Sequence, residues 1–416
     1  MPTTKNEEYK YTDLSFILEN TMIGPSPTTP TDVDAAAAGH PLKQSSAATV
    51  VVVDGIVHSI TLGNDNELPK NAFVGRLVDA PSDVVAATLG TQSRSRGGPF
   101  ATLNGALARD AVVVYVPAHA TITKPVHILY LSSSNPTATS GAKVMTVSAP
   151  RALIVLEEGA AAEVIEEYSS MKNGSGSGGE NKYLVAAVTE IELDDRAALK
   201  HSYVELEAPN AAHFKSTLVN QGQESVYGLT EARLGGALTR HDLGIDQLGA
   251  STDSAMRSFL LAGESQLHDL HSKIKLDHPE GKAEQLHKCI AVHPSSRGVF
   301  DGNVKVNRLA QRTDAKQLSR NILLAPRATV NVKPNLQIIA DDVKCTHGCS
   351  VSDLEEEELF YLRSRGISEN VARQVLVYSF GREVVQHLRD EGVVGRVEAA
   401  TKQALATFTT AVAAIL

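Results

Sequence analysis

Four short turns with one shared sequence pattern constrain the fold of this chain more than any other feature. Each turn has an apolar residue, three turn-forming residues and then an alanine, as in VPAHATI, LEEGAAA, LDDRAAL and LAPRATV, which place Ala120, Ala160, Ala197 and Ala328. The first three begin at Val116, Leu156 and Leu193, which gives spacings of 40 and 37 residues. A small residue at a repeated corner lets successive rungs of a coiled β-sheet stack closely, so the pattern predicts a β-solenoid.

The solenoid pattern covers only the middle of the chain. Between residues 111 and 350, short runs of Val, Ile and Leu alternate with tight turns. Residues 1–110 combine a hairpin signal at Asp54-Gly55 with helical spacing, and residues 351–416 have helical patterns. We therefore predict a mainly β protein with a parallel β-helix core (111–350), an N-terminal α+β region (1–110) and a C-terminal helical region (351–416). Sustained hexapeptide periodicity is absent, which favours a right-handed coil, and an antiparallel β-sandwich is the alternative fold.

Composition excludes several classes of protein. The net charge is −9 and basic residues form no run, which argues against a nucleic-acid partner. Three cysteines in 416 residues indicate a reducing compartment rather than a secreted disulfide framework. The N-terminal sequence MPTTKNEEYKYTDL lacks the apolar stretch of a signal peptide, and the apolar tail of 13 residues is too short to span a bilayer. We expect a soluble protein that is neither secreted nor membrane-bound.

The segment DDVKCTHGCS places two cysteines and a histidine at alternate positions. In an extended strand, Val343, Cys345, His347 and Cys349 share one face, with neighbouring side chains about 6.5–7 Å apart. Ligands of one zinc ion lie within about 4 Å of each other. On a straight strand these side chains are therefore too far apart to chelate one ion, although a bend at Gly348 would bring them closer. The spacing suits a larger cluster, or a site completed by a second chain. From the alternation alone, burial inside the solenoid is the preferred interpretation over a ligand role.

No catalytic motif occurs elsewhere in the chain. The sequence has no H-E-x-x-H and no G-x-S-x-G, and its single Gly-Lys pair lacks the other residues of a phosphate loop. If nucleotide energy is required, another chain supplies it. In HDLHSKIKLDH, His268 and His271 fall on opposite faces of a strand, and we interpret them, with His278, as surface residues.

The C-terminal region begins with a candidate capping box and continues with a broad apolar stripe. Ser352 and Glu355 have the spacing of a capping box, and Gly366 is placed to end the first helix. The apolar positions of the next helix are Val371, Val375, Leu376, Tyr378, Phe380, Val384, Val385 and Leu388. This stripe is wider than one buried face requires. Core burial is the preferred interpretation, and a partner-docking face is the alternative.

Several long segments resemble one known family. RGVFDGNVKV, QRTDAKQLSRNILLAPRATVNVKPNLQIIADDVKCTHG, EEELFYLRSRGI and the N-terminal PTTKNEEYKYTDLS are similar to the SufB/SufD family of iron–sulfur cluster assembly proteins, and to its SufD branch in particular. The resemblance covers effectively the whole chain and is weakest through residues 20–110 and the glycine-rich insert at 171–182. It implies a right-handed parallel β-helix with terminal helical parts, in a scaffold subunit that is not itself an enzyme.

The resemblance also implies partners and a cofactor. A SufD-type chain pairs with SufB through a β-helix edge and binds the SufC ATPase through its C-terminal helical region. The chain's candidates for the SufC contact are Leu359, Phe360, Tyr361, Val371, Val375 and Tyr378. A transient iron–sulfur cluster is then built at the SufB–SufD interface, the isolated chain holds no stable cofactor, and flavin binding in the complex is open. A homodimer of the isolated chain is possible, and the compartment is a plastid stroma or a bacterial cytoplasm.

The family pattern extends to individual residues. Cys345, Thr346, His347 and Gly348 match the Cys-x-His-Gly of SufD, and His347 matches its candidate interface ligand. Cys349 is the weakest candidate, because SufD chains usually have alanine there. SufB-type chains carry Asn-Cys-x-x-Cys-Asp where this chain has DAKQLSRN, so sulfur acceptance is assigned to the partner. The alternatives are a stand-alone metal- or redox-sensing protein using Cys345 and Cys349, and a carbohydrate-active β-helix enzyme, which the absence of Trp disfavours.

Overall fold

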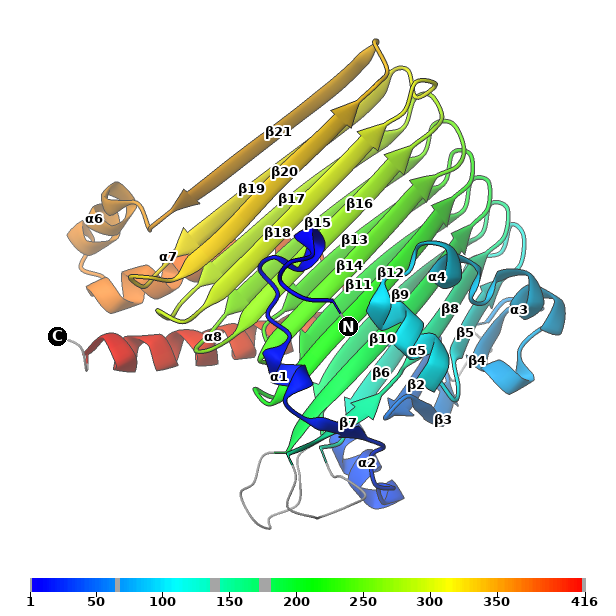
Figure 1. Cartoon of the computed structure of the whole chain (residues 1–416), viewed down its shortest axis with the longest axis horizontal. Helices are drawn as coiled ribbons and strands as arrows, with labels where there is room; N and C mark the ends of the chain where they lie inside the picture. The colour runs from blue at the N-terminus through cyan, green and yellow to red at the C-terminus, as the bar shows by residue number, and fades with distance from the viewer. Residues whose placement is uncertain (1, 64–67, 135–142, 172–180, 414–416) are drawn as a thin grey trace.

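Two stacked β-sheets form the centre of the molecule (Figure 1). The computed structural model describes residues 2–63, 68–134, 143–171 and 181–413. Among these residues, the first sheet has 11 strands: β1 (Thr21–Ile23), β4 (Phe73–Arg76), β5 (Val112–Val116), β7 (Val144–Ser148), β8 (Arg151–Leu156), β10 (Lys182–Leu193), β12 (Ala211–Gln221), β14 (Leu238–Gln247), β16 (Leu267–Leu276), β18 (Arg297–Val306) and β20 (Thr329–Ile338).

The second sheet faces the first across a shared interior. Within the described residues it has 10 strands: β2 (Ala48–Val53), β3 (Ile56–Leu62), β6 (Val126–Ser132), β9 (Ala161–Ser170), β11 (Ala198–Leu206), β13 (Val226–Arg233), β15 (Asp253–Ala262), β17 (Lys282–Ala291), β19 (Thr313–Leu323) and β21 (Val343–Ser352). From β8 onward, consecutive strands alternate between the two sheets, and each strand pairs in parallel with the strand two places along the chain. The β-solenoid prediction is confirmed, and the antiparallel sandwich is wrong.

The predicted corners have a specific backbone conformation. His119, Gly159 and Arg196 have φ values of 58°, 65° and 60°, in the left-handed region. The N–H of His119 donates to the carbonyl of Glu158 at 2.8 Å, and the N–H of Gly159 donates to the carbonyl of Asp195 at 2.8 Å. Each corner is thus hydrogen-bonded to the corresponding corner of the next rung, and the small side chain that follows leaves room for this approach.

The same corner recurs where the alanine pattern is lost. Left-handed residues at Glu224, Ser251, Glu280 and Arg312 continue the hydrogen-bonded ladder, and Ser225, Thr252, Gly281 and Thr313 replace the alanine. The fourth alanine turn, Leu324–Val330, instead joins β19 to β20 and lies at the opposite end of the strands from the other three. The four turns therefore do not form one stack: three lie at one end of the strands, and the fourth lies in the stack of turns at the other end.

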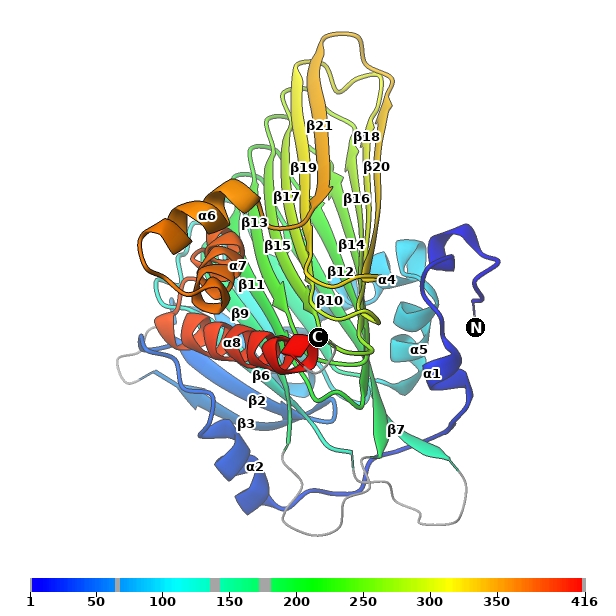
Figure 2. The same ribbon diagram turned by 90° about the vertical axis from the view of Figure 1, so that its left-hand side faces the viewer.

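The N-terminal region extends both sheets and covers part of the first. β2 pairs in parallel with β6 and forms a hairpin with β3, whose turn has left-handed φ values at Asp54 (50°) and Gly55 (85°), as the hairpin signal predicted. Its helical segments are η1 (Glu7–Tyr9), α1 (Ser15–Leu18), α2 (Pro30–Ala37), η2 (Leu77–Asp79), α3 (Ser82–Thr88), α4 (Thr91–Arg96) and α5 (Pro99–Leu107). Helices α4 and α5 lie against the outer face of the first sheet (Figure 2).

Three C-terminal helices cover the second sheet: α6 (Glu356–Ser364), α7 (Glu369–Val385) and α8 (Glu391–Ala413). The capping box at Ser352 is wrong, because Ser352 still pairs with Ile322 in the sheet and α6 begins after Glu355. Gly366 has a φ of 84°, as expected after a helix end. None of the described helices has the length and apolarity needed to cross a membrane.

Candidate functional site

Both sheets end in an open edge at the same end of the solenoid. β21 pairs with β19 and β20 pairs with β18, and no other described strand pairs with the outer edge of either (Figure 1). An unpaired edge presents free N–H and C=O groups that can pair with a strand of another chain. Within the described residues, the last rung therefore ends in backbone groups that no further strand of this chain satisfies.

The three candidate ligands share the inward face of β21. Cys345, His347 and Cys349 are in register with three β19 residues, Ala315, Gln317 and Ser319, which are all at most 2% exposed. Because neighbouring strands of a parallel sheet orient paired side chains alike, the candidate ligands point toward the solenoid interior at its open end. The shared face predicted from the alternation is confirmed.

The expected burial of these residues is wrong. Cys345 is only partly buried, and His347 and Cys349 are exposed. An inward-facing side chain becomes buried only when rungs lie on both sides of it, and no described rung follows β21. The third cysteine, Cys289, is two strands earlier in the same sheet and fully buried, and burial raises its pKa to about 12.

Burial favours the neutral form of the two thiols of the last rung. Partial burial raises the pKa of Cys349, and burial together with the charge of Asp314 raises the pKa of Cys345. A thiolate is the form that binds metal, so ligation requires a cation that displaces the proton. Among the described residues, no group of three or more His, Cys, Asp or Glu side chains is arranged to hold a metal ion. The donors stand separately along the strand.

A hydrogen-bonded chain of amide side chains, which sequence reasoning missed, leads to the site from the interior. Gln317 donates to Gln285 Oε1 at 2.5 Å, and Gln285 donates to Ser272 Oγ at 3.1 Å. Two buried acceptors of β19, Gln317 Oε1 and Asn321 Oδ1, have no hydrogen-bond partner among the described residues. The signal in the sequence was weak: two glutamines at inward positions of strands that pair in register. The penultimate strand of this sheet, β19, thus carries free hydrogen-bond acceptors next to β21, the strand that carries the histidine and the two thiols.

Charged groups also fill the interior far from the open end. Lys215 Nζ donates to Glu166 Oε2 at 2.8 Å, and His201 Nε2 lies 2.9 Å from the same oxygen; all three side chains are fully buried. Burial alone would raise the pKa of Glu166, but Lys215 and His201 hold it well below its usual range. These groups satisfy one another and are sealed from solvent, so they contribute to the packing of the core and not to an accessible site.

His268 belongs to this interior set, which corrects its assignment to the surface. It is fully buried, its Nδ1 lies 3.0 Å from Thr239 Oγ1, and burial lowers its pKa to about 3. His271 is on the opposite face of β16, as predicted, where Nε2 lies 3.0 Å from Asp269. His278 is exposed.

The candidate docking residues of the C-terminal helices divide into two groups. Leu359 is 3% exposed and packs in the core between the helices and the second sheet, and Tyr378 donates a hydrogen bond to Glu398 of α8. The other four are exposed over 41–72% of their surface: Phe360, Tyr361, Val371 and Val375. An apolar surface therefore remains on α6 and the first turns of α7 after the helices have packed.

Taken with the open edge, these features define a two-sheet parallel β-solenoid protein whose final rung displays sulfur and nitrogen donors. Comparison with known families matches residues 1–128 to the SufBD protein N-terminal region and residues 137–380 to the SufBD core domain of the SUF system for FeS cluster assembly. The chain belongs to the SufB/SufD family of iron–sulfur cluster assembly proteins.

The curated relatives of the chain include plant, cyanobacterial and bacterial proteins. Protein ABCI7, chloroplastic, of Arabidopsis thaliana is 40% identical over 92% of this chain and 78% of its own length. A SufBD family iron–sulfur cluster assembly protein of Synechocystis is 33% identical over 95% of this chain and 86% of its own. The iron–sulfur cluster assembly protein SufD of Escherichia coli is 29% identical over 97% and 89%.

Proposed function

We propose that this chain is a SufD-like scaffold subunit of the SUF complex, which builds a nascent iron–sulfur cluster at an interface with SufB. The observation that carries the proposal is the last rung, where both sheets end unpaired and three donor side chains face the open interior. A β-helix of similar width could continue each sheet by strand addition. The donors would then lie between two solenoids, with the remaining ligands supplied by SufB.

His347 is the principal ligand in this proposal, with Cys345 beside it and Cys349 as the weakest candidate. Adjacent inward positions of β21 are about 6.5–7 Å apart, which suits a cluster of several metal ions better than a single ion. Imidazole and thiolate are both suitable ligands for iron in such clusters. The cluster is the product of the complex and not a resident cofactor of the isolated chain.

The scaffold role divides the chemistry among three proteins. The chain has no phosphate-binding motif, so ATP hydrolysis belongs to SufC. The exposed apolar surface of Phe360, Tyr361, Val371 and Val375 is the proposed contact for SufC. We assign residues 1–110 to the N-terminal part, 111–350 to the scaffold core and 351–416 to SufC docking, and we place the protein in a plastid because of its similarity to a chloroplastic relative.

The test is anaerobic cluster reconstitution on the purified complex with SufB and SufC. We expect the complexes carrying His347→Ala or Cys345→Ser to form with normal stoichiometry and to yield less than one tenth of the cluster absorbance. The matched control is His278→Ala, because His278 is also an exposed solenoid histidine but lies at a corner. A normal cluster yield with His347→Ala would remove the ligand role, and failure of the chain to co-purify with SufB would remove the scaffold role.

The SufC contact requires a separate test. Replacing Phe360 and Tyr361 together with glutamate should abolish co-purification with SufC but leave the pairing with SufB intact, because these exposed residues lie on α6 and not on the strands of the open edge. The control is Leu309→Glu, an exposed leucine on the turn between β18 and β19. Retention of SufC by the double variant would contradict the proposed surface.

A further inference from the structure

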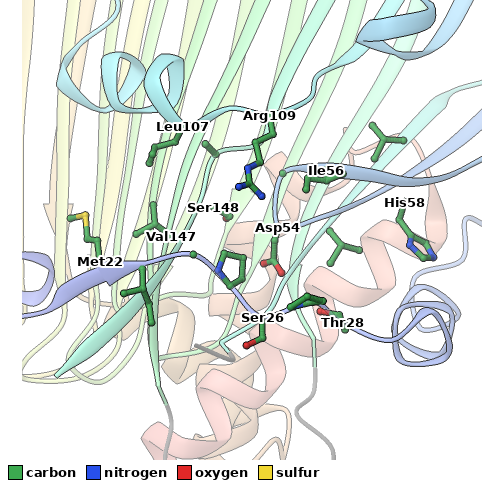
Figure 3. Close-up of a pocket in the computed structure, with 18 of the residues that line it drawn as sticks. Met22, Ser26, Thr28, Asp54, Ile56, His58, Leu107, Arg109, Val147 and Ser148 are labelled. Atoms are coloured by element: carbon green, nitrogen blue, oxygen red, sulfur yellow. The ribbon is translucent and has the colours of Figure 1, made fainter. Parts of the chain in front are cut away.

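A cavity of about 970 Å³ lies at the end of the solenoid opposite the last rung. Its walls come from β1 and the segment after it, the β2–β3 hairpin, α5 with the residues that follow it, and the end of β7 with the turn before β8 (Figure 3). Most of the wall is apolar, and its main contributors are Met22, Ile56, Leu103, Leu107 and Val147. Ligand sites in proteins are typically cavities of about 300–1,000 Å³ with mainly apolar walls and a few polar groups.

The walls of the cavity are held in place before any ligand binds. Asn104 of α5 is fully buried and donates at 2.8 Å to the carbonyls of Pro150 and Ala186, which fixes the helix on the first sheet. The hairpin tip is equally constrained: a Cβ at Gly55 would lie 3.0 Å from the carbonyl carbon of Ala149. Asp54 accepts hydrogen bonds from the backbone N–H and the hydroxyl of Ser133 at 2.9 and 2.7 Å. The cavity is therefore preformed.

One positive charge lines the cavity, on the exposed side chain of Arg109. Figure 3 shows the side chain of Arg109 directed into the cavity from the end of α5. Within the part of the chain that the structure describes, Arg109 has no hydrogen-bond or ion-pair partner. Its neighbour Asp110 is already engaged, because it accepts from Arg76 Nε at 3.1 Å and from the N–H of Val57 at 3.3 Å.

The other ionisable groups of the cavity do not compensate Arg109. The carboxylate of Asp54 is bound to Ser133, and burial raises its pKa to about 6. His58 is a lining residue, and its Nε2 lies 3.9 Å from Asp34, a carboxylate that does not line the cavity. A ligand that fits this arrangement has an acidic group to meet the guanidinium and an apolar body to cover the walls.

We propose that this cavity binds an organic carboxylate with an apolar body, of the medium-chain fatty-acid type. The carboxylate pairs with Arg109, and the chain lies against Leu103, Leu107 and Val147. The site is separate from the last rung in sequence and in space, so it does not depend on the scaffold role. It gives the subunit a small-molecule site remote from the cluster interface.

The test is titration of the full-length chain with decanoate, below its micelle concentration, by calorimetry. We expect saturable binding at one site, at least tenfold weaker binding by Arg109→Met, and partial recovery in Arg109→Lys. Arg308→Met is the matched control, because Arg308 is an exposed arginine on the turn between β18 and β19. Decanol, which lacks the charge, should bind at least tenfold more weakly than decanoate.

The variant Leu107→Glu distinguishes binding of decanoate in the cavity from binding elsewhere on the protein. Leu107 is 44% exposed, so the variant should fold, and its carboxylate would repel an anion from the wall. We expect it to lose decanoate binding while retaining the circular dichroism spectrum of the wild-type chain. Absence of saturable binding to the wild-type chain, or binding that Arg109→Met and Leu107→Glu both leave unchanged, would overturn the proposal.

Discussion

Arg396 of α8 forms a two-pronged ion pair with Glu167 of β9, a residue 229 positions earlier in the chain. Both contacts, from Nε and Nη2, are 2.6 Å long, and the Glu167 side chain is fully buried. His40 and His127 approach the same carboxylate at 2.9 and 3.2 Å. Burial alone would raise the pKa of Glu167, but these three neighbours hold it well below its usual range. The pair fixes the last helix on the second sheet.

Replacing Arg396 with methionine should therefore destabilise the chain. Removal of one partner of a buried ion pair leaves an uncompensated charge, and we expect the free energy of unfolding to fall by about 3 kcal/mol. The measurement is urea denaturation followed by circular dichroism. The control is Arg312→Met, which breaks the exposed pair with Glu280 and should cost less than about 1 kcal/mol. Equal effects of the two substitutions would contradict the role of the buried pair.

Gly302 tests the packing next to the last rung. A Cβ at this position would lie 2.2 Å from Gln317 Nε2 and 2.7 Å from Phe300 Cζ. We expect Gly302→Ala to lower the free energy of unfolding by ~1–3 kcal/mol, as overpacking of a filled interior does. In Gly395→Ala, on α8, the added methyl meets no atom within 4 Å, so this variant should instead gain roughly 0.5–1 kcal/mol. The two thermal unfolding midpoints should move in opposite directions.

The interior carboxyl groups make stability depend on pH. Burial raises the pKa of Glu205 to about 7 and that of Glu207 to about 8. At these two positions the folded chain therefore binds more protons than the unfolded chain above the ordinary glutamate pKa, so their contribution to stability should fall as the pH rises from about 4.5 to 8. Above about pH 6.5, where the buried histidines no longer titrate, unfolding midpoints should decline less steeply in Glu207→Gln. If the unfolding midpoint of the Glu207→Gln variant declines with pH as steeply as that of the wild-type chain, groups other than Glu207 cause the decline.

Buried histidines act in the opposite direction at lower pH. Burial lowers the pKa values of His213, His268 and His287 to about 3. Between pH 3 and 6.5 the unfolded chain binds the extra protons at these three positions, so the contribution of these histidines to stability should rise with pH over this range. Replacing His287 with glutamine should flatten the acid limb of the stability profile. If stability of the His287→Gln variant depends on pH as steeply as that of the wild-type chain in this range, His287 does not contribute to the acid limb.

The three cysteines should differ in reactivity in the folded chain. Cys349 is exposed, Cys345 is partly buried and Cys289 is sealed, so a thiol reagent should modify them in that order, and Cys289 only after denaturation. Because burial raises the pKa of both thiols of the last rung, their rates should still increase above neutral pH. Mass spectrometry of the modified peptides gives the order. Fast modification of Cys289 would show that the interior opens.

The solenoid could be predicted from the sequence because its corners impose a local requirement. Ala160 and Ala197 follow left-handed residues and sit under the next rung, which leaves a recognisable pattern. Later corners meet the same requirement with Ser225 and Thr252, so the pattern fades although the structure does not change. The position of Leu324–Val330 in the stack of turns at the other end of the strands depends on strand lengths, which the pattern does not contain.

The shared face of the three candidate ligands could be predicted from the sequence, and their exposure could not. Alternation on β21 gave the shared face of Cys345, His347 and Cys349, because a strand fixes that face locally. Their exposure depends on β21 being the last strand of its sheet, which is a property of the whole fold. The buried charges around Glu166 and Lys215 were missed for a related reason: their partners come from strands far apart in the sequence.

Corner-to-corner hydrogen bonding has a consequence for how this protein is held together. Among the described strands, each inner rung has a neighbour on both sides, whereas β20 and β21 have one each, so we expect these two strands to fray before the inner rungs and a terminal cap to steady them. A subunit that stacks on this end would order β21, the strand that carries the candidate ligands, and would supply the remaining ligands at the same time. Amide hydrogens of β21 should then exchange rapidly in the lone chain and slowly once the cap is in place.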